Sequence, residues 1–326
     1  MINISLKNDF RLFFTKMPEG PEVTIMCDYV RTILCRPEAT LKDVTFISGK
    51  YLAKPPKHYL EYKNYLQDQT DRVKSVNKKG KFSWWEMESG WKISITFGMS
   101  GMFKQEPTED SLEVLNRFSK KKKSMEDICK HFRTKIIVSL PNDKEETFYY
   151  QDMRSFGTWE FFPPGKDIKL QEKINKLGYD IIDLNISDSQ IVANCRIWNS
   201  KSICKLLMEQ SWPFSGIGNY LKAEILYRCK VNPYAKVYEL DDDILVKIAR
   251  TGHELANTAY SMGGTSLILF SGHDYQEGGF HTKLLVYDKK KDPLGNPVIQ
   301  DKKTDDKRTT WWVKEVQTIG VPPSKN

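Results

Sequence analysis

Short runs of β-branched and aromatic residues dominate the sequence between residues 73 and 151. They occupy positions 73–76, 82–87, 91–97, 135–140 and 147–151. Short stretches that contain Gly80 and the pair Ser89-Gly90 separate the first three runs, and the turn-forming stretch 141–144 separates the last two. Strands joined by connections this short are antiparallel neighbours. This part of the chain is therefore expected to form a β-sandwich or barrel.

The periodicity of the apolar residues changes near Asp167. Apolar residues three or four positions apart predict helices at 170–177, 203–210, 220–230 and 241–261. We place a domain boundary between Pro163 and Asn185. From Lys283 onward strand-like runs around turns return, which predicts a hairpin module attached to a helical domain.

The region before residue 73 and the stretch that interrupts the strands are less regular. The sequence predicts a helix at 21–34, which opens with proline and glutamate, and a strand at 41–51. The charged stretch 105–130, which includes four consecutive lysines at 120–123, is either a solvated insertion loop or a basic arm. We favour the loop.

The composition excludes several classes of protein. The chain has 326 residues, a net charge of +8 and an isoelectric point near 8.9, which favours a polyanionic partner. Its six cysteines include no Cys-x-x-Cys pair, so neither a cysteine-paired zinc site nor a disulfide-stapled fold is expected. The sequence contains no apolar run of membrane-spanning length and no signal-peptide core.

The segment 17–23, Met-Pro-Glu-Gly-Pro-Glu-Val, has the character of an amino terminus although sixteen residues precede it. A chain that began at Pro18 would carry a free secondary amine, which is a nucleophile, and Glu19 beside it could transfer protons. An internal proline nitrogen cannot react in this way because it belongs to an amide. We therefore expect residues 1–17 to be absent from the mature protein. The alternative is a turn that leads into an amphipathic helix.

A second segment combines a helix, a glycine-rich turn and another helix. It comprises 206–210, then Gly216-Ile217-Gly218-Asn219 with the helix that follows, then 231–233. The first turn of the second helix presents unpaired N–H groups beside Asn219, and such an end binds a phosphate well. Plain turn chemistry is the alternative.

Together these segments resemble the formamidopyrimidine-DNA glycosylase and endonuclease VIII family, with five motifs in family order between Pro18 and about Gln317. The resemblance implies an α+β fold. A two-layer antiparallel β-sandwich flanked by helices would occupy 18–165, a helix-two-turn-helix domain 186–282 and a β-hairpin finger 283–319. The amino-terminal sequence Gly-Pro-Glu at 20–22 is similar to that of the endonuclease VIII branch. The glycines at 263–264 and 278–279 resemble the lesion-capping loop of the formamidopyrimidine branch, or they form a flexible connector.

The resemblance implies a bifunctional DNA glycosylase and AP lyase that excises oxidised bases and cleaves the strand by β,δ-elimination. Pro18 would attack the sugar C1′ and Glu19 would transfer protons. Lys81, after Gly80, would contact the phosphate near the damaged nucleotide, and Arg308 would clamp the lesion phosphates with its bidentate guanidinium. The alternatives for Lys81 are a surface lysine in a hairpin and, for the whole protein, a catalytically inactive binder of damaged DNA.

Other residues match the family's DNA contacts. Met99, Arg154 and Phe156 resemble the trio that fills the space left by a flipped base. Asn219 matches the asparagine that grips the DNA backbone, and His131 resembles a DNA-contact histidine, although an exposed histidine in a basic loop is an equal alternative. Two departures from the family are Thr96-Phe97, where many members have a histidine, and Ser155, where members have a second arginine.

The finger departs from the family's zinc module. The four ligand positions fall near Lys291, Leu294, Val313 and Val316, none of which suits zinc. The segment therefore resembles the zincless variant, in which packing by residues such as Trp311 and Trp312 replaces the metal. We expect no metal and no cofactor, damaged DNA as the partner, no membrane association and a monomer. The expected location is intracellular and DNA-associated, in the nucleus of a eukaryote or otherwise in the cytoplasm or nucleoid.

Overall fold

The computed structural model describes residues 17–109, 112, 113, 116, 122, 124–265 and 278–320. By its internal contacts the chain divides into two compact units. Of the described residues, 17, 18, 22–172, 263–265 and 278–279 belong to the first unit, and 19–21, 173–262 and 280–320 to the second. The extension 1–16, most of the basic run 120–123 and the residues 266–277 of the predicted capping loop lie outside the described residues.

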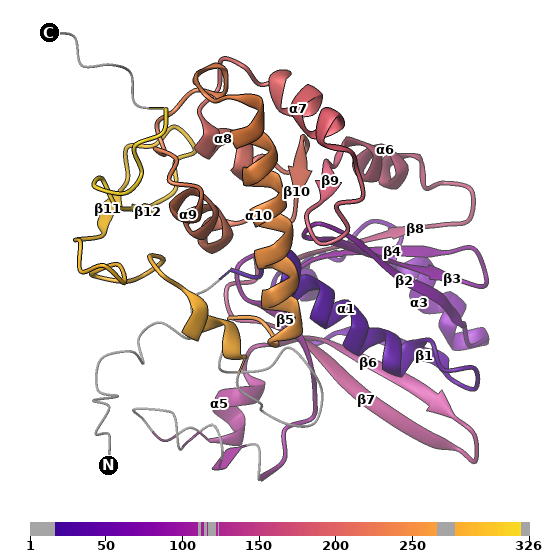
Figure 1. Cartoon of the computed structure of the whole chain (residues 1–326). Helices are drawn as coiled ribbons and strands as arrows, with labels where there is room; N and C mark the ends of the chain where they lie inside the picture. Colours follow the sequence, from indigo (N-terminus) through magenta and orange to yellow (C-terminus); the bar gives the residue numbers. More distant parts are fainter. Residues whose placement is uncertain are drawn as a thin grey trace, which may run out of the picture. The chain divides into compact units, whose positions relative to one another are not determined.

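The first unit contains two four-stranded antiparallel sheets (Figure 1). One has the order β1 (Thr40–Phe46), β6 (Phe132–Leu140), β7 (Lys144–Asp152), β5 (Gly101–Gln105). The other has the order β2 (Val73–Lys79), β3 (Phe82–Met87), β4 (Lys92–Thr96), β8 (Thr158–Phe162). Every strand pair in these two sheets is antiparallel, as the short connections predicted, and the expected α+β fold with an antiparallel sandwich is confirmed.

An aromatic core joins the two sheets of this unit. Trp159 on β8 meets Tyr150 on β7 with ring centroids 5.5 Å apart, and Trp85 on β3 meets Phe103 on β5 at 5.8 Å. All four side chains are at most 2% exposed. Alternate residues of β6 point into this core, which is the period of two expected for a strand with one covered face.

Helices cover this core. Helix α1 (Gly20–Leu34) buries Val23, Met26 and Val30, which lie three or four positions apart and so share one face. This unit also contains the helices α2 (Lys50–Ala53), α3 (Tyr59–Asp68) and α5 (Met125–Cys129). The strand predicted at 41–51 is too long, because β1 ends at Phe46 and Gly49 takes a positive φ of 81° that ends the extended backbone.

The second unit is mainly helical. It contains α7 (Asp188–Arg196), α8 (Ile203–Met208), α9 (Asn219–Arg228) and α10 (Asp242–Ser261), while α6 (Ile168–Lys176) spans the point at which the units divide. Every residue of α9 from Tyr220 to Tyr227 is buried, so α9 is the central helix, and α10 packs against it (Figure 1). Gly252 permits this approach, since a Cβ there would lie 3.1 Å from Ile225.

Short elements complete this unit. They are β9 (Tyr179–Asp180), β10 (Phe214–Ser215), β11 (Ile299–Asp301), β12 (Thr310–Trp312) and the 3₁₀ turns Val237–Glu239 and Gly279–Lys283. The antiparallel pair β11–β12 is the hairpin expected near the end of the chain. Among the helices that the structure describes, none combines the length and the apolar character needed to cross a membrane.

Candidate functional site

Two loops of the first unit meet because of the strand register. Residues 97–100 connect β4 to β5, and residues 153–157 connect β7 to β8. Thr96 pairs with Thr158 in one sheet, and Gly101 pairs with Asp152 in the other. The two connections therefore begin and end side by side, although about fifty residues separate them in the sequence.

The approach of these loops is close. Gly98 has a φ of 55°, and a Cβ on it would lie 2.7 Å from the Gly157 nitrogen and 2.9 Å from the Phe156 Cβ. A side chain at position 98 would thus be strained by its backbone conformation and would also collide with the second loop. Glycine at this position is what lets Met99 and Phe156 occupy neighbouring loops.

Asp152 holds the second loop in shape. Its buried carboxylate accepts hydrogen bonds from the Ser100 hydroxyl at 2.5 Å, from the Arg154 N–H at 3.1 Å and from the Gly157 N–H at 2.8 Å. The same Ser100 oxygen accepts a second bond from the Arg154 N–H, at 3.0 Å. Both loops are therefore fixed to one carboxylate, which the sequence reasoning did not identify.

The structure brings Met99, Arg154 and Phe156 together on these two loops; we call them the loop cluster. An Arg154 guanidinium nitrogen, Nη1, lies 3.3 Å from the Met99 sulfur. Phe156 is 58% exposed, which is unusual for so large an apolar side chain in a folded unit. The cluster thus offers an aromatic ring, a thioether and a cation to a partner.

Lys81 and His131 also lie in the first unit. Lys81 follows Gly80, whose φ is 59°, in the two-residue turn of the β2–β3 hairpin, and it is partly exposed. His131 is half-buried directly before β6, and its carbonyl accepts the Asp152 N–H at 2.9 Å. His131 is therefore joined by its backbone to the residue that holds the loop cluster.

Glu19 belongs to the second unit, at the amino end of α9. Its carboxylate is 2% exposed and accepts the N–H groups of Gly218 at 2.8 Å, Tyr220 at 2.8 Å and Leu221 at 3.2 Å. These are the unpaired N–H groups of the first helical turn, where the helix dipole is positive. A Cβ on Gly218 would lie 2.2 Å from the Glu19 carboxyl carbon, so this approach requires glycine.

Glu19 therefore occupies the amino end of α9, where the sequence predicts that a phosphate binds. Asn219, the first residue of α9, donates from its side chain to the Thr309 carbonyl at 2.9 Å. Burial raises the pKa of the nearby Tyr287 hydroxyl, and the negative charge of Glu19 raises it further. Glu19, Asn219 and Tyr287 are thus neighbours in one polar cluster of the second unit.

A buried ion pair fixes the loop that carries Arg308. The Lys222 ammonium on α9 donates to Asp306 at 2.5 Å and to the Thr310 hydroxyl at 2.8 Å, and the side chains of Lys222 and Asp306 are fully buried. Asp306 also accepts from the Thr304 hydroxyl at 2.7 Å. Arg308, two residues away, is exposed.

Further contacts attach the finger to α9. The Glu224 carboxylate accepts the N–H groups of Leu285, Val286 and Tyr287 at 2.9 to 3.0 Å. Val313 and Val316, at two of the positions that correspond to zinc ligands, pack in a cluster with apolar residues that include Trp311. Among the described residues, no group of three or more His, Cys, Asp or Glu side chains is arranged to hold a metal.

Pro18 is buried, and its nitrogen is bonded to Met17 in the chain as described.

The predicted site residues fall into two groups, one in each unit. Pro18, Lys81, Met99, His131, Arg154 and Phe156 lie in the first unit, and Glu19, Asn219 and Arg308 in the second. Four residues that position them were missed from sequence: Ser100, Asp152, Lys222 and Asp306. Only the place of Asp152 at the end of a strand-forming run, two residues before Arg154, offered a signal.

Two family models match the chain. The model described as the formamidopyrimidine-DNA glycosylase N-terminal domain matches residues 17–159, and that of the C-terminal domain matches 277–318. Together they cover more than half of the 326 residues. The first match begins at Met17.

Relatives that align over most of this chain agree with these matches. The formamidopyrimidine-DNA glycosylase of Cytobacillus firmus is 25% identical over 281 residues, which cover 85% of this chain and 90% of the relative. That of Mycoplasma genitalium is 26% identical over 290 residues, which cover 88% and 91%.

Solved structures of other proteins named Fpg share the fold. The MutM (Fpg) protein from Thermus thermophilus aligns with a TM-score of 0.68 at 23% identity and covers 92% of this chain and 98% of its own. The Lactococcus lactis Fpg, solved with abasic-site DNA, aligns at 0.69 and 19% identity and covers 92% and 99%. The architecture is therefore that of the two-domain formamidopyrimidine-DNA glycosylases. The chain belongs to the formamidopyrimidine-DNA glycosylase and endonuclease VIII family.

Proposed function

We propose that this protein is a DNA glycosylase of base excision repair that also cleaves the DNA strand as an AP lyase. One observation carries the proposal. The match to the family model begins at Met17, so Pro18 is the second residue of the matched segment. Glu19, the next residue, accepts hydrogen bonds from three backbone N–H groups at the start of α9. The substrate class is DNA that contains oxidised bases, and the protein acts as a monomer.

The reaction requires the free amine of Pro18. After removal of Met17, the Pro18 nitrogen attacks C1′ of the damaged nucleotide, the bond to the base breaks, and an iminium forms between proline and the opened sugar. Loss of a C2′ proton then expels the 3′ phosphate, and a second elimination expels the 5′ phosphate. Water hydrolyses the iminium and restores the amine.

Glu19 transfers protons in these steps. The three N–H donors and the positive end of α9 stabilise the negative charge that its carboxylate carries whenever it has given up a proton. The same contacts fix the orientation of the carboxylate. A proton-transfer group must be held in place in this way if it is to act on a substrate.

The loop cluster supports extrusion of the damaged base. A base that leaves the stack opens a gap, and apolar or aromatic side chains fill such gaps. Phe156 is exposed for stacking, Met99 is flexible, and Arg154 supplies hydrogen-bond donors to the orphaned base. Lys81, His131, Asn219 and Arg308 are assigned to the phosphates, and Arg308 stabilises the one that leaves.

Borohydride trapping tests the lyase. Two forms of the protein, one beginning at Met17 and one at Met1, are incubated with duplex DNA that carries an abasic site, and borohydride then reduces any iminium to a stable covalent link. We expect an adduct from the Met17 form, with Pro18 as the attached residue in a peptide map. A retained extension should abolish it, because the Pro18 nitrogen is then part of an amide. The lyase proposal is wrong if the Met17 form gives no adduct.

A second candidate function applies if the residues before Pro18 remain attached. With residues 1–16 attached, the Pro18 nitrogen is part of an amide, and the protein would bind damaged DNA without cleaving it. Sequencing of the amino terminus of the protein purified from its own cells distinguishes the two functions. A terminus at Pro18 supports the enzyme, and a terminus upstream of Met17 supports the inactive binder.

A further inference from the structure

The first loop of the cluster, residues 97–100, keeps its shape by a bond of its own. The Gly101 N–H donates to the Phe97 carbonyl at 2.7 Å and closes the turn. At the base of the loop the Tyr150 hydroxyl donates to the Thr96 carbonyl at 3.1 Å. A Cβ on Gly101 would lie 2.2 Å from that hydroxyl oxygen, so glycine leaves the room for it. The first loop therefore holds its turn without a contact to the second.

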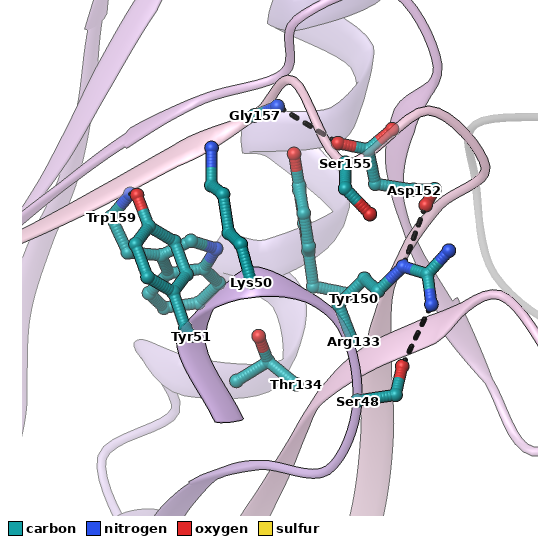
Figure 2. Close-up of a pocket in the computed structure, with 10 residues that line it drawn as sticks. All are labelled: Ser48, Lys50, Tyr51, Arg133, Thr134, Tyr150, Asp152, Ser155, Gly157 and Trp159. Carbon is teal, nitrogen blue, oxygen red and sulfur yellow. Dashed lines mark hydrogen bonds between the residues drawn. The ribbon is translucent and has the colours of Figure 1, made fainter. Parts of the chain in front are cut away.

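The second loop, residues 153–157, is also closed by bonds of its own. The two carboxylate oxygens of Asp152 accept the N–H groups of Arg154 and Gly157, and the first of these bonds is an Asx turn. The Asp152 carbonyl accepts from Arg133 on β6 at 2.8 Å, as Figure 2 shows together with the bond from Gly157. Asp152 thus keeps the second loop in shape independently of the first.

The Ser100 hydroxyl joins the two loops. Ser100 is the last residue of the first loop, and it donates to the Asp152 carboxylate at 2.5 Å and accepts the Arg154 N–H at 3.0 Å. It is 6% exposed, and a hydrogen bond shielded from water in this way is stronger than an exposed one. A serine hydroxyl donates and accepts at once, whereas alanine does neither and a cysteine thiol does both only weakly. Both bonds run between the loops, and neither closes a loop on itself.

The other side-chain contact between the loops is weaker. Arg154 Nη1 lies 3.3 Å from the Met99 sulfur, but Arg154 is exposed and Met99 is partly exposed. A thioether sulfur is a poor acceptor, and at the surface water competes for the guanidinium. Gly98 permits the loops to approach but offers no side chain to hold them together. The relative position of the two loop tips therefore depends on Ser100.

We propose that Ser100 is a positioning residue that couples the two loops, so that Met99, Arg154 and Phe156 enter the duplex as one unit. The inference rests on the proposed function, because it concerns the entry of the loop cluster into DNA. A unit that enters as a whole gains all of its contacts or none. Loops that enter independently would each contribute a separate factor to the affinity.

A double-mutant cycle tests the coupling. The affinity of the full chain for a duplex with an uncleavable abasic-site analogue is measured for wild type, Met99→Ala, Phe156→Ala and the double variant. If the loops enter as one unit, either truncation already disfavours entry, and the second removes little more. We therefore expect the double variant to bind roughly threefold or more tightly than the product of the two single losses predicts.

Ser100→Ala should abolish this coupling. In the Ser100→Ala background each loop enters separately, so the losses from Met99→Ala and Phe156→Ala should multiply to within about twofold. Melting curves establish that each variant is folded. If Ser100→Ala unfolds the chain, Ser100→Cys takes its place, since the thiol fills a similar space but forms only weak hydrogen bonds.

Ser83→Ala is the matched control. Ser83 is a serine of the same unit that is 1% exposed, and its hydroxyl donates to the Ile95 carbonyl at 3.0 Å between β3 and β4. Its loss should lower the melting temperature, as Ser100→Ala does, but leave the coupling at its wild-type value. A purely structural role of Ser100 would make the two serine variants behave alike.

Three results would overturn the inference. They are losses that multiply in the wild-type background, a coupling that survives Ser100→Ala, and a coupling that disappears in Ser83→Ala as well. A wild type that binds no damaged DNA would refute the proposed function and this inference with it. Normal binding in which the two losses multiply would refute only the inference.

Discussion

The buried carboxylate of Glu19 lies at the amino end of helix α9. Its carboxylate accepts three N–H groups from the start of α9, and all of them lose a charged acceptor in Glu19→Gln. The amide nitrogen of glutamine would also face N–H donors. We expect Glu19→Gln to lower the free energy of unfolding by about 1–3 kcal/mol, measured by urea denaturation. An unchanged unfolding midpoint would contradict the hydrogen-bonded carboxylate.

Truncation of Phe156, in contrast, is expected to change the free energy of unfolding very little, although the side chain is large. Because it is 58% exposed, Phe156→Ala should change the free energy of unfolding by less than about 0.5 kcal/mol. If the ring stacks on a base, the same change should weaken binding to abasic-site DNA by about 1–3 kcal/mol. A fluorescence titration with labelled duplex measures this loss.

Leu60→Ala provides the control for that prediction. Leu60 on α3 is 59% exposed and belongs to the same unit, but it is far in sequence from the loop cluster. It should retain wild-type DNA affinity. Equal losses in both variants would show that exposed apolar area in general, and not Phe156, supports binding.

At the scale of elements, the Lys222–Asp306 pair attaches the finger to α9. Removal of one member of a buried ion pair leaves the other charge uncompensated, at a cost of about 3–5 kcal/mol. We therefore expect Lys222→Met to destabilise the protein by that amount. Strand cleavage at abasic sites should also slow, because the loop that carries Arg308 loses its attachment.

The double variant Lys222→Met with Asp306→Leu separates charge from packing. It removes both buried charges, so it should be more stable than Lys222→Met alone. If it recovers stability but not the cleavage rate, the ion pair positions Arg308. Recovery of both would show that apolar contacts suffice to place the loop.

An ion pair between β4 and the start of α6 gives a pH dependence. Lys92 donates to Asp167 at 2.6 Å, and this bond and one from Gln171 lower the pKa of Asp167 from its usual 3.8. The folded protein therefore binds fewer protons than the unfolded chain near that pH. The stabilisation is complete above 3.8 and is lost as the pH falls through the lower folded pKa.

Asp167→Asn tests this dependence. Both side chains of the pair are 24% exposed, so we expect the variant to be about 0.5–1 kcal/mol less stable than wild type at pH 7. The difference should shrink steadily as the pH is lowered below 3.8. Urea midpoints at several pH values measure it, and a difference that grows in acid would refute the assignment.

At the scale of the whole molecule, the net charge of +8 predicts salt-sensitive DNA binding. If six or more phosphates are contacted, the affinity should fall by about 10³-fold or more between 50 and 200 mM salt. The binding of undamaged duplex should show a similar slope at lower affinity, because phosphates carry no sequence information. An affinity that does not change with salt would exclude the backbone as the main contact.

Local sequence patterns predicted most elements but not their limits. The run 82–87 is a strand at those same residues because its alternation matches one buried face. Helix α3 was not predicted, although Tyr59, Tyr62 and Leu66 lie at helical spacing and are buried. The strand predicted at 41–51 is too long because the residues around Gly49 do not reveal its positive φ.

The sequence by itself determined the antiparallel connections, the change from strands to helices and the residue types that match the family. Those properties depend on neighbours along the chain, through side-chain periodicity and turn chemistry. Tertiary structure alone decided that the loop with Met99 meets the loop with Phe156, because the pairs Gly101–Asp152 and Thr96–Thr158 lie in different sheets. It also decided that Glu19 occupies the end of α9, since about 200 residues separate the partners and only the folded backbone brings the N–H groups to the carboxylate.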